Sequence, residues 1–94
     1  MNIIKPLRRH GVFLQDIGRE AMLYCTREKY FHILNPTARL IWELCDGKHT
    51  IEDMEQAMRN HFSLAAEYNV TEDILQTLNF FSNKGLLETI VQKK

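Results

Sequence analysis

The chain has 94 residues, enough for one domain with a modest hydrophobic core. Its 12 basic and 12 acidic residues cancel, and this balance argues against a protein that binds nucleic acid by neutralising phosphates. No apolar run approaches the roughly 20 residues that cross a bilayer, and the first residues lack the apolar core of a secretion signal. We therefore expect a cytoplasmic protein with no membrane partner, in which Cys25 and Cys45 are buried free thiols.

A polar lead-in over residues 1–10 opens the chain, and we expect it to be flexible unless something docks on it. Three short strands are predicted next, because branched and aromatic residues are bounded by Gly or by polar turns over residues 12–17, 21–25 and 30–34.

The third strand is apolar on both of its faces. Phe31 and Ile33 point to one face, and Tyr30, His32 and Leu34 point to the other. An edge strand that is covered on only one side would not need this pattern.

The helix after the third strand carries both a start signal and a stop signal. Asn35 can cap its first turn, Pro36 suits the first helical position, and Gly47 is expected to end it in the left-handed conformation. Apolar residues recur at spacings of three and four and so share one face of the helix, namely Ala38, Ile41, Trp42 and Cys45. Leu40 and Leu44 widen that face, so we expect the helix to be sandwiched in the core.

A second helix is predicted to begin after Thr50, which can form a capping box with Asp53. It has a single apolar stripe on an otherwise charged surface, formed by Ile51, Met54, Met58 and Phe62.

A third helix is capped by Asn69 or Thr71 and ends at Lys84 and Gly85. Its core stripe is formed by Ile74, Leu78 and Phe81, with Leu75 and Phe80 on opposite flanks of that stripe. Residues 86–91 form a short terminal strand or an extended tail. The order predicts an α+β, winged helix-turn-helix-like domain, with a three-stranded antiparallel sheet followed by a three-helix bundle.

No sequence motif indicates an enzyme. The chain lacks a Gly-rich phosphate loop, the G-x-S-x-G motif and the H-E-x-x-H motif. The four histidines stand singly, at His10, His32, His49 and His61. We expect no metal, no cofactor and no catalytic residue, because no two candidate ligands share a familiar spacing.

Two binding functions fit such a domain. A winged helix can be a DNA-binding transcriptional regulator, but the third helix begins with Glu72 and Asp73, which would meet the phosphates directly. Alternatively, an edge strand can accept a strand from a partner peptide, and the third strand beside Leu75 or Phe80 would make an apolar groove for it. An open edge also allows a homodimer or a segment swap.

Several blocks of the sequence together resemble the PqqD family, the coenzyme PQQ synthesis protein D group, whose fold is also called the RiPP recognition element. These blocks are L-N-P-T-A at residues 34–38, I-W-E-L-C-D-G at residues 41–47, Thr50-Ile51, Asp73-Ile74 and K-G-L-L at residues 84–87.

The resemblance implies a non-catalytic peptide chaperone. Such domains bind the leader of a ribosomally made precursor peptide and present it to a modifying enzyme, which is a radical SAM enzyme or a leader peptidase. Members dedicated to PQQ resemble one another in a Tyr-Pro-Glu-Gly turn before the third strand. Residues 24–29 differ from this pattern, which favours another peptide product.

The resemblance also implies where the leader binds. It would add as a strand to the third strand, in a groove against the third helix. The strand edge would be formed by Tyr30, Phe31, His32, Ile33 and Leu34. The helix wall would be formed by Asp73, Leu75, Gln76, Thr77, Leu78, Phe80 and Phe81.

Overall fold

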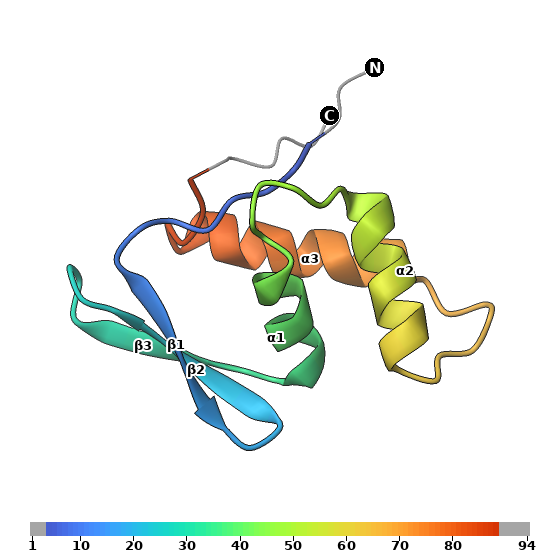
Figure 1. Ribbon diagram of the computed structural model, residues 1–94, viewed down its shortest axis with the longest axis horizontal. Helices are drawn as coiled ribbons and strands as arrows, with labels where there is room; N and C mark the ends of the chain where they lie inside the picture. Colours follow the sequence, from blue (N-terminus) through green and yellow to red (C-terminus); the bar gives the residue numbers. More distant parts are fainter. Residues whose placement is uncertain (1–3, 89–94) are drawn as a thin grey trace.

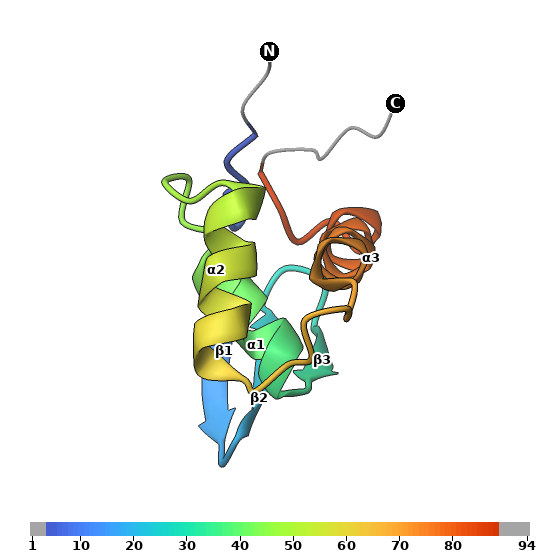
Figure 2. The same ribbon diagram turned by 90° about the vertical axis from the view of Figure 1, so that its right-hand side faces the viewer.

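The computed structural model of the protein describes residues 4–88. Its elements, in chain order, are β1 (Val12–Ile17), β2 (Glu20–Cys25), β3 (Tyr30–Leu34), α1 (Pro36–Glu43), α2 (Ile51–His61) and α3 (Val70–Asn83). The strands form one antiparallel sheet, which confirms the predicted α+β arrangement. Helix α1 contacts β2 and β3 as well as α2 and α3, so it joins the sheet to the helical layer (Figures 1 and 2).

The core lies where the inner face of the sheet meets the helices. Trp42 packs edge-on against Phe81, with ring centroids 5.2 Å apart. The predicted stripes supply six further core residues, namely Ile41, Cys45, Met54, Met58, Ile74 and Leu78. Cys25 and Cys45 are buried free thiols, and burial raises the pKa of Cys45 to about 12. A thiol with so high a pKa acts as a packing group and not as a nucleophile.

Side chains cap the start of all three helices. Asn35 caps α1, and Thr50 and Asp53 exchange both hydrogen bonds of a capping box at α2. At α3 the cap is Asn69 rather than Thr71. The predicted start signals are therefore confirmed.

The cap of α1 gives a stability prediction. The Oδ1 atom of Asn35 accepts the backbone N–H of Ala38 at 2.8 Å. Replacing Asn35 by Ala should lower the free energy of unfolding by about 1 kcal/mol, because one N–H of the first turn loses its partner. Asn35→Asp keeps the acceptor and is the control. Urea denaturation measures both variants, and equal stability of the two would contradict the capping role.

Helix α1 ends earlier than predicted. It stops at Glu43, with Leu44 as its C-cap, and does not continue to Gly47. Gly47 has a φ of +78°, but its N–H donates to the carbonyl of Pro6 at 2.9 Å. The sequence prediction was wrong here because the partner of this turn comes from the distant lead-in.

The described part of the lead-in is bonded to the rest of the domain, which differs from the flexibility we expected. The N–H of Arg8 donates to the carbonyl of Cys45 at 2.9 Å, and the N–H of Arg9 donates to that of Leu86 at 2.9 Å. The lead-in thus lies between the end of α1 and the segment after α3. The predicted tail over residues 86–91 begins with this pairing, and its last three residues lie outside the described part of the chain.

Candidate functional site

Strand β3 has an open edge. The sheet order is β1-β2-β3, and β3 pairs with β2 from Tyr30 opposite Cys25 to Leu34 opposite Ala21. Within residues 4–88, no strand pairs with the other side of β3. The segment after α3 does not close this edge, because it pairs with the lead-in instead. An unpaired edge strand can accept the backbone of another chain.

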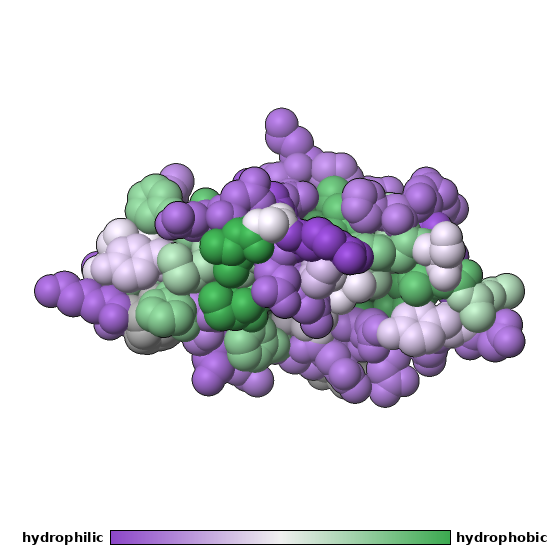
Figure 3. Space-filling model, turned by 90° about the horizontal axis from the view of Figure 1, so that it is seen from below, coloured by the Kyte–Doolittle hydropathy of each residue, from purple (hydrophilic) through white to green (hydrophobic). Residues whose placement is uncertain are grey.

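The two faces of β3 differ, which corrects the expectation that both are covered. Leu34 is buried and His32 is half-buried against the helices, whereas Phe31 and Ile33 are 59% and 53% exposed. The apolar side chains on the outer face of β3 are therefore exposed to solvent. Figure 3 shows hydrophobic residues among hydrophilic ones on the face that it views, both at the sheet end of the molecule and toward its helical end.

Helix α3 runs beside the open edge without closing on it. Among the described residues, no Cα of β3 lies within 8 Å of a Cα of α3, whereas paired strands are about 4.8 Å apart. The gap is bridged by the rings of His32 and Phe80, which meet edge-on with centroids 5.6 Å apart.

A cleft of about 280 Å³ opens beside this ring contact, and we call it the β3–α3 cleft. It is lined by residues from the end of β3, the start of α1 and one flank of α3, namely Ile33, Leu34, Asn35, Ala38, Gln76, Thr77 and Phe80. This lining combines apolar side chains with amide and hydroxyl groups and carries no charged residue. Such a cleft suits the uncharged side chains of an extended peptide.

A family model described as coenzyme PQQ synthesis protein D (PqqD) matches residues 14–87, which is most of the chain. The chain belongs to the PqqD family. No curated protein matches it significantly in sequence. Among solved structures, TbiB1 in complex with the TbiA(beta) leader peptide has the same fold, with a TM-score of 0.78 and 22% identity. That match covers 92% of this chain and 99% of the TbiB1 chain.

This PqqD domain brings together some of the helix residues predicted from the sequence. Gln76, Thr77 and Phe80 line the β3–α3 cleft. Leu78 and Phe81 are completely buried in the core, so they support the helix from behind and present no surface. The flank of α3 that faces the cleft is therefore the Phe80 flank.

Two other predicted wall residues lie outside the cleft. Leu75 lines a separate hollow with Asn79 on another side of α3. Asp73 lies in the first turn of α3, where its carboxylate accepts a hydrogen bond from the hydroxyl of Tyr68. This bond ties the α2–α3 loop to the helix, which is a structural role.

The sequence prediction missed two residues that line the cleft, Asn35 and Ala38. Both belong to the motif that resembled the family, but we interpreted that motif only as a capping signal. Their position directly after β3 is the signal that could have found them, because a helix that starts at the end of an edge strand must flank that edge. Lys84 lies near this site, with its Nζ atom 5.9 Å from the ring centroid of Phe80.

Acid should destabilise the domain through His32. Its pKa is lowered in the fold, first by burial and second by the positive charge of Lys84. In the unfolded chain the imidazole titrates at about pH 6.5. Below that pH the unfolded state binds more protons than the folded state, so the free energy of unfolding decreases as the pH is lowered. The contribution of His32 to the free energy of unfolding is fully present above its pKa in the unfolded state. It is lost as the pH falls through its lower pKa in the folded state.

The measurement is the midpoint of urea unfolding between pH 7 and pH 5. We expect a larger fall in the wild type than in His32→Gln, in which the other titratable groups are unchanged. Parallel curves for the two proteins would show that His32 is not the group responsible.

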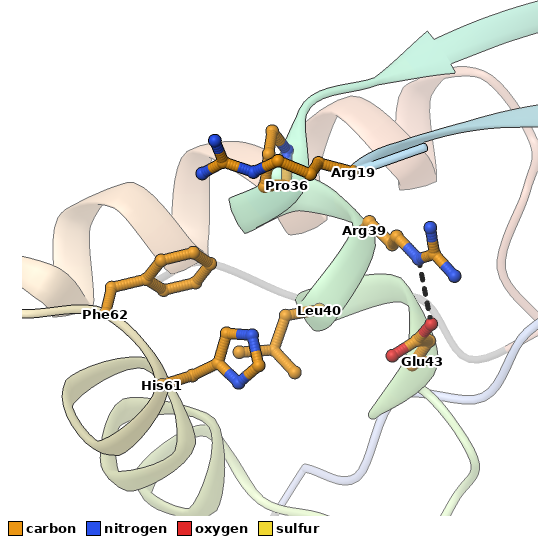
Figure 4. Close-up of a pocket in the computed structure, with 7 residues that line it drawn as sticks. All are labelled: Arg19, Pro36, Arg39, Leu40, Glu43, His61 and Phe62. Atoms are coloured by element: carbon orange, nitrogen blue, oxygen red, sulfur yellow. Dashed lines mark hydrogen bonds and ion pairs between the residues drawn. The ribbon is translucent and has the colours of Figure 1, made fainter. Parts of the chain in front are cut away.

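A larger hollow of about 430 Å³ lies on the other side of α1, between the β1–β2 turn and the end of α2 (Figure 4). Its wall is built by Arg39, whose Nε atom lies 3.1 Å from a carboxylate oxygen of Glu43. The same guanidinium pairs with Asp16 and donates to the carbonyls of Gly18 and Glu20 at 3.1 Å. These bonds fasten the turn to α1, so we interpret the hollow as structural.

Nothing in the described part of the chain points to a metal site or a membrane span. Over residues 4–88, no three His, Cys, Asp or Glu side chains are grouped so that they could hold a metal ion. The helices of this region are also too short or too polar to cross a bilayer.

Proposed function

We propose that this domain binds the leader of a ribosomally made precursor peptide and presents it to a modifying enzyme, with no catalysis of its own. The observation that carries the proposal is the open edge of β3 beside the β3–α3 cleft. A leader that adds as a strand satisfies its backbone groups on β3, while alternate side chains enter the cleft. Membership of the PqqD family and the fold shared with a leader-bound TbiB1 support the proposal.

The partner enzyme follows from the same proposal. A radical SAM enzyme or a leader peptidase would act on the core of the precursor while its leader is held here. The family description names PQQ synthesis, but residues 24–29 differ from the turn of PQQ-dedicated members. We therefore infer a peptide product other than PQQ.

The affinity should be moderate, because a disordered leader loses conformational freedom when it becomes a strand. Backbone hydrogen bonds and one or two buried anchors should leave a net binding free energy of roughly −8 kcal/mol, which is a micromolar Kd. Since the lining of the cleft is uncharged, little of this free energy should come from ion pairing.

The experiment is calorimetric titration of the full chain with the leader of the precursor peptide encoded beside its gene. We expect a micromolar Kd that changes less than about threefold between 50 and 200 mM salt, since few counterions are released. A duplex DNA of random sequence is the control and should not bind. Salt-sensitive DNA binding without leader binding would support the transcriptional regulator instead and would contradict the proposal.

A further inference from the structure

The outer face of the sheet carries an aromatic row that ends at the open edge of β3. In the register of the sheet, Phe13 lies opposite Tyr24, and Tyr24 lies opposite Phe31. The three side chains are 60%, 40% and 59% exposed, respectively. The row thus crosses all three strands on the side away from the helices.

A second row runs parallel to the first and also ends at the edge. Ile33 on β3 lies opposite Met22 on β2 and is 53% exposed. Strand β3 contains neither a Pro nor an Asp, Glu, Lys or Arg, the residues with which edge strands commonly discourage pairing. The outer face is therefore apolar up to the position where a further strand would begin.

We propose that the leader is recognised on both of its faces, so that the recognised segment is a continuous apolar run of about five residues, the length of β3. This inference rests on the proposed function. Side chains alternate along a strand, so one set enters the β3–α3 cleft and the other set extends the outer face beside Phe31 and Ile33. Apolar side chains suit both places, because the cleft is lined without charged residues and the outer face offers the exposed side chains of Phe31 and Ile33 for contact.

The occupant is the leader itself, because the rows are continuous with the edge to which it would pair. Side chains on neighbouring strands of one face contact each other across about 5 Å. Phe31 is therefore within reach of an added strand. Phe13 has the same chemistry and exposure but lies two strands, or about 10 Å, further from that strand.

These two phenylalanines make a matched test. Phe31→Thr and Phe13→Thr each remove one aromatic residue paired with Tyr24 in the register of the sheet and keep a residue that favours strands. The probe is a displayed library of random 15-residue peptides, selected on the immobilised full chain. The best peptide selected by the wild type is then titrated against both variants and against Phe80→Ala.

We expect the wild type to select apolar residues at consecutive positions. Phe31→Thr should weaken the selected peptide about fivefold, and Phe13→Thr should change its Kd less than twofold. Selection of alternating apolar and polar residues, or equal effects of the two Thr variants, would overturn this inference. If Phe80→Ala still weakened binding in that case, the proposed function would stand. Failure to enrich any peptide would overturn both.

Discussion

Replacing Phe80 by Ala should weaken leader binding by about 30-fold, or about 2 kcal/mol, while the fold remains intact. Phe80 is 38% exposed, lines the β3–α3 cleft and holds its ring against His32. It is therefore the large apolar side chain best placed to anchor a peptide beside the edge of β3. Calorimetric titration with the leader measures the effect, and thermal unfolding shows whether the fold survives.

Leu75→Ala is the matched control for Phe80→Ala. Leu75 comes from the same helix and is also partly buried, but it lines a different hollow. Its replacement should leave the Kd of the leader within about twofold of the wild-type value, since the side chain is out of reach. A larger loss for Leu75→Ala than for Phe80→Ala would place the peptide on the other flank of α3.

A proline in β3 should have a still larger effect on the peptide, because it removes a backbone donor and adds a bulky ring at the edge. Neighbouring residues of a strand direct their N–H groups to opposite sides. Of His32→Pro and Ile33→Pro, one therefore blocks the open edge and the other disturbs the pairing of β3 with β2.

We expect the edge-blocking variant to stay folded and to bind the leader about 30- to 150-fold more weakly, a loss of about 2–3 kcal/mol. The other variant should be destabilised, because its proline disturbs the pairing of β3 with β2. Circular dichroism and thermal unfolding assign the two roles before any titration. If every proline variant that remains folded bound the leader with wild-type affinity, strand addition to β3 would be contradicted.

Local signals in the sequence predict most of this fold. The caps at Asn35, Thr50 and Asn69 are side-chain chemistry within a single turn, so no knowledge of the tertiary structure is needed to find them. The same holds for the helix stripes, since Met54, Met58 and the apolar residues of α3 follow the helical repeat.

Contacts between distant segments could not be predicted in this way. The early end of α1 at Glu43 and the bonding of the lead-in depend on hydrogen bonds between segments far apart in the chain. The flank of α3 that faces β3 was also undecided, because the helical repeat places Leu75 and Phe80 symmetrically about the core stripe. Only the packing of α3 beside β3 directs Phe80 into the cleft.

The outer face of the sheet gives a different lesson. A strand that is apolar on both faces predicts burial of both, and Phe31 and Ile33 are nevertheless exposed. Apolar residues that remain exposed on a small domain commonly mark a surface that another molecule covers. The mismatch between pattern and burial at these two residues is therefore the feature of β3 that bears most on function.

Hydrogen exchange of the backbone amides of residues 30–34, followed by NMR with and without the leader, tests strand addition most directly. The amides of β3 that face the open edge should exchange at least about tenfold more slowly in the complex, since each gains a carbonyl partner. The amides that already pair with β2 should change little. Binding of the leader with unchanged exchange throughout β3, and with new protection elsewhere in the domain, would contradict a leader strand on this edge.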